Sequence, residues 1–133
     1  MIVLSNTAQQ TLAPGQSIVF DLSVMHTGCG EFHRKNSNQV RLRANGLYEL
    51  HFSGAVAGTS GDAVKLTIHL DGEPLNETAM QSTATAVTDF NTVANATLIR
   101  NCGMGANTVS VTNSGTTTVT LAPNSSFFIK RDS

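Results

Sequence analysis

The sequence predicts an all-β fold, a sandwich of about eight to ten antiparallel strands, and three observations lead to this prediction. Apolar and polar residues alternate with a period of two along most of the chain, and no window shows the stripe of an amphipathic helix. Turn-forming residues separate the alternating runs at intervals of roughly 8–12 residues, which is typical of sandwiches and barrels. Thr, Ser and Asn together number 40, whereas charged residues make up only 13% of the chain. A jelly-roll β-sandwich fits the strand count.

The length predicts a single domain. A chain of 133 residues buries enough surface to be stable without a disulfide framework or a metal. Residues 1–12 begin with a brief apolar run and continue with polar residues, so we expect an N-terminal arm or a first short strand there. Residues 13–133 are predicted to form the jelly-roll domain.

The first full strand is expected at 18–24, after the turn at 13–16. Ile18, Phe20, Leu22 and Val24 share one parity in this run, which predicts that they face the core. The other expected strands, in chain order, are 40–43, 45–57, 64–70, 75–88, 90–100, 108–112, 117–122 and 126–130.

The strand expected at 45–57 has two chemically distinct faces. After Gly46, the apolar side chains of Tyr48, Leu50 and Phe52 fall on one parity, and we expect them in the core. Glu49 and His51 fall on the other parity. The sequence therefore predicts a strand that packs a core on one side and offers a different surface on the other.

The later strands are marked by their turns. Asp71 and Gly72 follow the alternating run at 64–70 and form the strongest hairpin signal in the chain. In the last strand, alternation sends Phe127 and Phe128 to opposite faces. An outward Phe128 is better explained by a subunit interface than by exposure to water.

A resemblance to a known superfamily rests on the pattern Gly46-x-Tyr48-x-Leu50-x-Phe52. This pattern resembles the Gly-x-Tyr-x-Phe-x-Phe strand of the complement first-component and tumour-necrosis-factor superfamily of jelly rolls, with Leu50 in place of a Phe. Val40 stands where a Phe of the longer superfamily pattern is expected. The match covers one strand closely and the order of strands broadly.

Three flanking segments resemble the short microbial versions of this fold, which occur in bacteriophage head-fibre or decoration proteins and on Firmicutes spore surfaces. These segments are 12–18, the turn at 27–29, and 70–72 before a stretch rich in Thr and Ala. The resemblance implies a homotrimer in which the sheet with the Gly-x-Tyr strand faces the threefold axis. It implies no catalytic residue. The candidate interface residues are Leu47, Glu49, His51 and Phe128.

The residues themselves predict no enzyme, no cofactor-binding site and no metal site. The four histidines lack the close spacing of a zinc motif, and a solvated or interface imidazole is the favoured interpretation. Glu49 and His51 are two residues apart on one strand, where interface hydrogen bonding is commoner than acid–base catalysis. One hypothesis is kept: three copies of His51 meeting on a trimer axis would bind a metal or an anion, or respond to pH.

Two cysteines, Cys29 and Cys102, lie in Gly-flanked turns far apart in the sequence. A bridge between them would close a long loop and stabilise the fold. Sequence alone leaves a disulfide and two free thiols equally open.

Charge and hydropathy reduce the number of function classes to consider. A net charge of -1 gives no footprint for nucleic acid, and no apolar run is long enough for a membrane span. We expect a non-enzymatic homotrimer on a virion surface, a bacteriophage head-fibre or decoration protein, attached to its capsid or another particle through the N-terminal arm. The alternative is a bacterial adhesin-type module, extracellular or on a spore surface, that binds a host-surface glycan or protein through loops 29–38 and 58–62.

Overall fold

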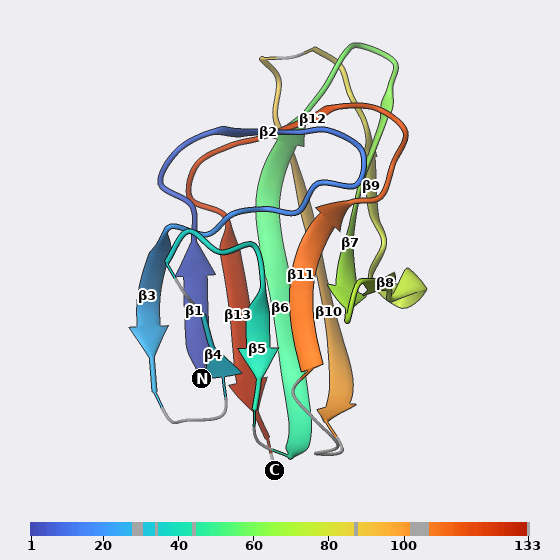
Figure 1. Cartoon of the computed structure of the whole chain (residues 1–133). Helices are drawn as coiled ribbons and strands as arrows, with labels where there is room; N and C mark the ends of the chain where they lie inside the picture. The colour runs from blue at the N-terminus through green and yellow to red at the C-terminus, as the bar shows by residue number, and fades with distance from the viewer. Residues whose placement is uncertain (28–30, 34, 44, 87, 102–106, 133) are drawn as a thin grey trace.

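The computed structural model describes residues 1–133 except 28–30, 34, 44, 87, 102–106 and 133. The chain folds into two antiparallel sheets stacked face to face, so the predicted all-β jelly-roll sandwich is confirmed. Figure 1 shows β5 and β11 of one sheet lying in front of β13, β6 and β10 of the other. We name the two layers the β6 sheet and the β7 sheet.

The β6 sheet has the order β2-β12-β6-β13-β1-β3, with β10 on the free side of β6. Its strands are β1 (Ile2–Ser5), β2 (Gln10–Leu12), β3 (Leu22–His26), β6 (Gly46–Ala57), β10 (Asn91–Asn101), β12 (Val119–Leu121) and β13 (Ser126–Arg131). The β7 sheet has the order β4-β5-β11-β7-β8, with β9 also paired to β7. Its strands are β4 (Glu31–Phe32), β5 (Val40–Leu42), β7 (Ala63–Leu70), β8 (Glu73–Pro74), β9 (Met80–Thr83) and β11 (Asn107–Asn113).

Strand β6 organises its sheet. It pairs with β10 on one edge from Gly46 to Val56, and with β13 and then β12 on the other edge. Gly46 opens the strand at φ 146°, a backbone conformation that favours glycine. The long strand expected at 45–57 is present and runs from Gly46 to Ala57.

The N-terminal segment belongs to the sandwich. β1 lies between β13 and β3, and Ile2 and Leu4 are completely buried in the shared core. β2 pairs with β12 at the other end of the sheet. The interpretation of residues 1–12 as an arm outside the sandwich is therefore wrong, because their apolar side chains complete the core; the first short strand is β1.

The prediction of one continuous strand at 18–24 is wrong, because the chain passes from the β7 sheet to the β6 sheet there. The Ile18 N–H donates to the Val111 carbonyl of the β7 sheet at 2.8 Å. Four residues later β3 begins, paired with β1 at the edge of the β6 sheet. Ile18 and Phe20 are buried as expected, but Leu22 and Val24 are 43% and 61% exposed.

The segment after β7 agrees with the prediction at its turn but differs from it in the strand that follows. Asp71 and Gly72 both have positive φ, at 54° and 83°, and turn the chain tightly from β7 into β8. The expected strand at 75–88 is shorter, because a 3-10 turn, η1 (Asn76–Thr78), precedes β9. The buried Thr78 hydroxyl fixes this turn by accepting the Ile68 N–H at 3.0 Å and donating to the Leu75 carbonyl at 2.7 Å.

Candidate functional site

The outer face of the β6 sheet is the candidate site. Tyr48, Leu50 and Phe52 point into the sandwich and are at most 2% exposed. Their neighbours Glu49 and His51 therefore point out of it, because successive side chains of a strand alternate between faces. The structure thus places the two chemically distinct faces of β6 on the core and on the surface.

One row of side chains crosses five strands on this face, and we call it the central row. Strand registers place Met25 opposite Val3, Val3 opposite Phe128, Phe128 opposite His51, and His51 opposite Ala96. Four of these five side chains are apolar. The row brings β3, β1, β13, β6 and β10 together, although these strands are scattered along the sequence (Figure 1).

His51 and Phe128 form the middle of the central row. Their rings pack edge to face, with centroids 5.5 Å apart and planes at 75°. His51 is exposed and Phe128 is half-buried, so the phenyl ring still presents apolar surface. A shallow hollow of about 440 Å³ lies beside the pair, with Ser53, Ala94 and Ser126 in its wall. These small side chains leave room for an apposed surface.

Charged residues flank the row on one side. Glu49 lies opposite Lys130 on β13 and opposite Leu98 on β10. Leu47, the remaining predicted interface residue, is half-buried and lies opposite Arg100. The face therefore combines an apolar middle with charges toward the Gly46 end of β6, as in many protein interfaces.

The two edges of the β6 sheet carry different apolar side chains. On β3, Leu22, Val24 and Met25 are exposed. On and just before β10, Leu98 and Phe90 are exposed. Single exposed apolar side chains are ordinary, whereas the three on β3 lie together on one short strand.

Several of these residues carried no signal in the sequence. Ala94, Ala96 and Leu98 share a parity in β10, yet the direction of that parity depends on which strand pairs with β10. Val3 lies in the segment predicted as an arm or a first short strand, and Met25 lies just after the strand expected at 18–24. The outward Phe128 was the one signal from these neighbouring strands that the sequence carried.

The histidines are spread over the molecule. His33 Nε2 lies 3.0 Å from the Ser37 carbonyl, His26 lies at the end of β3, and His69 lies on β7. Among the residues that the structure describes, no group of three or more His, Cys, Asp or Glu side chains is placed to hold a metal ion. Cys29 and Cys102 lie outside the described residues, as does part of loop 29–38.

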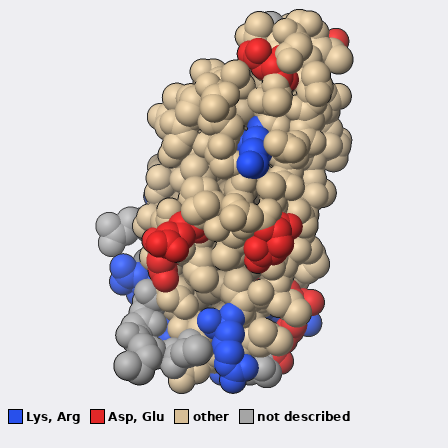
Figure 2. Space-filling view, turned by 90° about the vertical axis from the view of Figure 1, so that its right-hand side faces the viewer, with Lys and Arg blue, Asp and Glu red and all other residues tan. Residues whose placement is uncertain are grey.

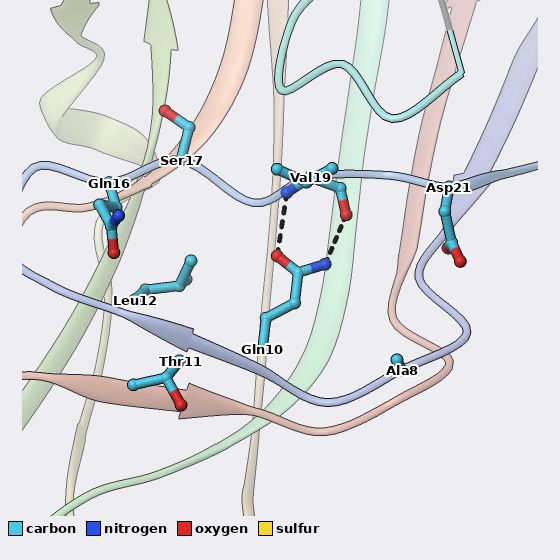
Figure 3. Close-up of a pocket in the computed structure, with 8 residues that line it drawn as sticks. All are labelled: Ala8, Gln10, Thr11, Leu12, Gln16, Ser17, Val19 and Asp21. Carbon is cyan, nitrogen blue, oxygen red and sulfur yellow. Dashed lines mark hydrogen bonds between the residues drawn. The ribbon is translucent and has the colours of Figure 1, made fainter.

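A second hollow, of about 360 Å³, lies between β2 and residues 16–21 (Figure 3). The Gln10 side chain reaches from β2 to the backbone of Val19 and forms two hydrogen bonds with it. Its oxygen accepts the Val19 N–H at 3.0 Å, and its NH₂ group donates to the Val19 carbonyl. The polar groups of Gln10 are therefore used to hold the crossing segment against β2, which gives this hollow a structural role.

The flank of the sandwich that carries β7 to β10 is mainly uncharged. Figure 2 shows its Lys, Arg, Asp and Glu side chains as separate small patches in a surface of other residues. Within the described part of the chain, no helix is long and apolar enough to cross a membrane.

The strand order, and the β6 strand with Tyr48, Leu50 and Phe52 in the core, define the protein as a jelly-roll sandwich. The particular fold is that of the tumour-necrosis-factor-like jelly rolls, because solved members of this type align over almost the whole chain. The Eiger TNF of S. frugiperda aligns with a TM-score of 0.76 at 10% identity, covering 99% of this chain and 91% of that one. The globular domain of zebrafish complement 1qA aligns with a TM-score of 0.64 at 9% identity, covering 98% of both chains.

A viral protein shares the fold as well. The PRD1 vertex protein P5 aligns with a TM-score of 0.53 at 18% identity, covering 98% of this chain and 97% of that one. No family model matches the sequence, and no curated protein matches it. The resemblance read from Gly46, Tyr48, Leu50 and Phe52 is thus confirmed at the level of the fold.

Proposed function

We propose that this protein is a non-enzymatic display module that assembles as a homotrimer on a particle, as a head-fibre or decoration protein of a bacteriophage virion. The observation that carries the proposal is the outer face of the β6 sheet, where an apolar row with small neighbours crosses five strands. Such a face is costly in water and favourable against a second protein surface.

The interface uses the residues expected from the sequence together with their neighbours. Phe128 and His51 form its middle, and Leu47 and Glu49 extend it toward the charged end. Full burial of an exposed Phe or Leu side chain contributes about 1.5–3 kcal/mol, and completing the burial of the half-buried Phe128 and Leu47 contributes a part of that. These contributions from each subunit work against the entropic cost of association. Three copies of His51 then approach the threefold axis.

The unlike edges of the sheet favour a closed ring. The apolar side chains at the β3 edge differ from those at the β10 edge, and a contact that joined one edge to the other would pair two different surfaces. Contacts of this heterologous kind generate rings when the rotation between neighbours closes. A threefold ring agrees with the trimer that the superfamily resemblance implies.

The likeness in fold to a vertex protein of PRD1 supports a place on a virion. A free N-terminal arm is no part of the attachment, because residues 2–5 and 10–12 are strands of the sandwich. The contact with the particle is then made by the surface of the folded domain.

Immunogold labelling of purified phage particles tests this placement. An antibody raised against the folded protein is expected to label the outer surface of the particles, and the chain should remain with them through a density gradient. Particles lacking the gene are the control. Recovery of the chain with cell envelopes or spores, with unlabelled particles, would instead support the adhesin-type alternative.

A further inference from the structure

The outer face of the β7 sheet contains outward-facing hydroxyl groups that are nevertheless buried. Val109 and Val111 of β11 point into the core, so Ser110 and Thr112 point outward, yet they are only 8% and 5% exposed. Residues 15–18 pair with the edge of β11 beside Thr112, and the Ser17 and Thr112 hydroxyls are 2.7 Å apart. The Ser110 and Thr112 hydroxyls also lie 3.4 Å apart, so these small side chains pack against their neighbours on the outer face.

A hollow of about 490 Å³ lies over β11, β7 and β8. Ser110, Thr112 and His69 are among the residues lining it, with Gln39, Ser114 and Pro74 around them. A volume of this size lies within the roughly 300–1,000 Å³ of small-molecule sites. The hollow is on the opposite layer of the sandwich from the central row.

His69 supplies an unused polar group in this hollow. It lies on β7 between Ser110 of β11 and Pro74 of β8. Its Nε2 atom is buried, and no described residue hydrogen-bonds to it. This nitrogen has almost no exposed surface, so a molecule in the hollow reaches it only when the imidazole ring turns; the nitrogen then gains the hydrogen bond that the chain does not make.

The lining determines the class of ligand. None of the described lining residues is Lys, Arg, Asp or Glu, so the hollow supplies no ion pair for a charged ligand. It offers hydroxyl, amide and imidazole groups instead, which donate and accept hydrogen bonds to neutral hydroxyls. We propose that this hollow binds a neutral saccharide unit, with His69 Nε2 and the Ser110 hydroxyl as its principal hydrogen-bonding partners.

The site exists in each chain and does not depend on the trimer for its groups. If the β6 sheets pack about the threefold axis, as in the proposed function, the β7 sheets face outward. Three copies of the hollow would then point away from the axis. Weak single sites that act together in this way reach a useful avidity on a glycan-coated surface.

NMR titration of the intact protein with glucose, galactose and N-acetylglucosamine tests the proposal. At least one sugar should shift the ring signals of His69 and the amide signals around Ser110. His69→Phe, which keeps a ring but removes its nitrogens, and Ser110→Ala should each weaken that sugar's affinity roughly tenfold. Thr83→Val, an exposed hydroxyl on β9 of the same sheet, should leave the affinity unchanged.

Three results would overturn the proposal. One is the absence of sugar-dependent shifts at His69, which would leave the hollow as a site for water only. Another is a sugar affinity that His69→Phe and Ser110→Ala leave intact while both variants keep the wild-type spectrum elsewhere. The third is tighter binding of inorganic phosphate or N-acetylneuraminic acid than of any neutral sugar, because the ligand would then be an anion. Trimer formation is measured separately, so its failure leaves the sugar result interpretable.

Discussion

Two buried asparagines hold together parts of the chain that are far apart in sequence. The Asn6 amide donates to the carbonyls of Ala8 and Ala122, at 2.9 and 3.1 Å, and its oxygen accepts the Ser125 N–H at 3.1 Å. Asn113 plays the same part at the end of β11, where it donates to the carbonyls of Leu12 and Thr117 at 2.9 Å. In a chain rich in Asn, Ser and Thr, residue type alone did not distinguish these side chains from polar surface.

Replacing Asn6 should therefore destabilise the protein. Asn6→Ala leaves the Ser125 N–H and the Ala122 carbonyl without their partner, which should lower the free energy of unfolding by about 1–3 kcal/mol. The matched control is Asn38→Ala, an exposed side chain, which should change it by less than about 0.5 kcal/mol. Urea unfolding measures both variants, and equal losses would contradict the role given to Asn6.

Asp21 gives the stability a pH dependence of known sign. The Thr7 hydroxyl and the Thr7 N–H both donate to its carboxylate, the latter at 2.8 Å, and they lower its pKa below the ordinary 3.8. A carboxylate with a lowered pKa in the folded state contributes stability above its unfolded pKa, and that contribution is lost as pH falls through the folded pKa.

Asp21→Asn should reduce the fall in melting temperature at acid pH. The wild type should lose melting temperature more steeply than the variant as pH falls below 3.8, because the variant has no carboxylate to protonate. The effect should be small, since Asp21 is partly exposed and its charge is screened by solvent. Thermal melts across the acid range measure it, and two parallel curves would show that the Thr7 hydrogen bonds do not favour the charged form.

Strand β6 was predictable from the sequence and β3 was not, for one physical reason. The alternation around Tyr48, Leu50 and Phe52 reflects a strand that stays in one sheet and keeps one face on the core. The alternation from Ile18 to Val24 continues across the point where the chain changes sheets. A periodic pattern records which residues are apolar, but not which sheet receives them.

The outward face of β6 could be predicted, but its surroundings could not. Glu49 and His51 follow from the parity of a single strand. The central row requires the registers of β1, β3, β10 and β13 against one another, and these come from long-range pairings that no local pattern encodes. The hollow around His69 has the same origin, because β8 and β11 approach β7 only in the folded chain.

Strand β10 offers a direct test of the proposed interface. Leu98 is 56% exposed and outside the buried core, so Leu98→Asp should leave the chain folded; like-charge repulsion from Glu49, which lies opposite, should lower the stability only slightly. A charge at this position must be desolvated in the interface, so the variant should dissociate. Val19→Asp is the control, since Val19 is also an exposed apolar residue but lies in the segment beside β2. Size-exclusion chromatography separates the two outcomes; a Leu98→Asp protein that elutes with the wild type would place the interface elsewhere.

The two layers of the sandwich have different surfaces, and this division is the basis of the proposed function. The β6 sheet presents an apolar row bordered by a few charges, which suits a contact between copies of the chain. The β7 sheet presents a polar hollow, which suits a small neutral ligand. Because the outer faces of the two sheets point in opposite directions, one can be buried in an assembly while the other remains accessible.

The molar mass in solution tests the proposed assembly most directly. Light scattering on the purified wild-type protein at micromolar concentration should give about three times the 14.0 kDa of one chain, since the apolar row of the β6 sheet is then buried between subunits. A mass of 14.0 kDa under the same conditions would contradict the trimer and with it the role proposed for this face.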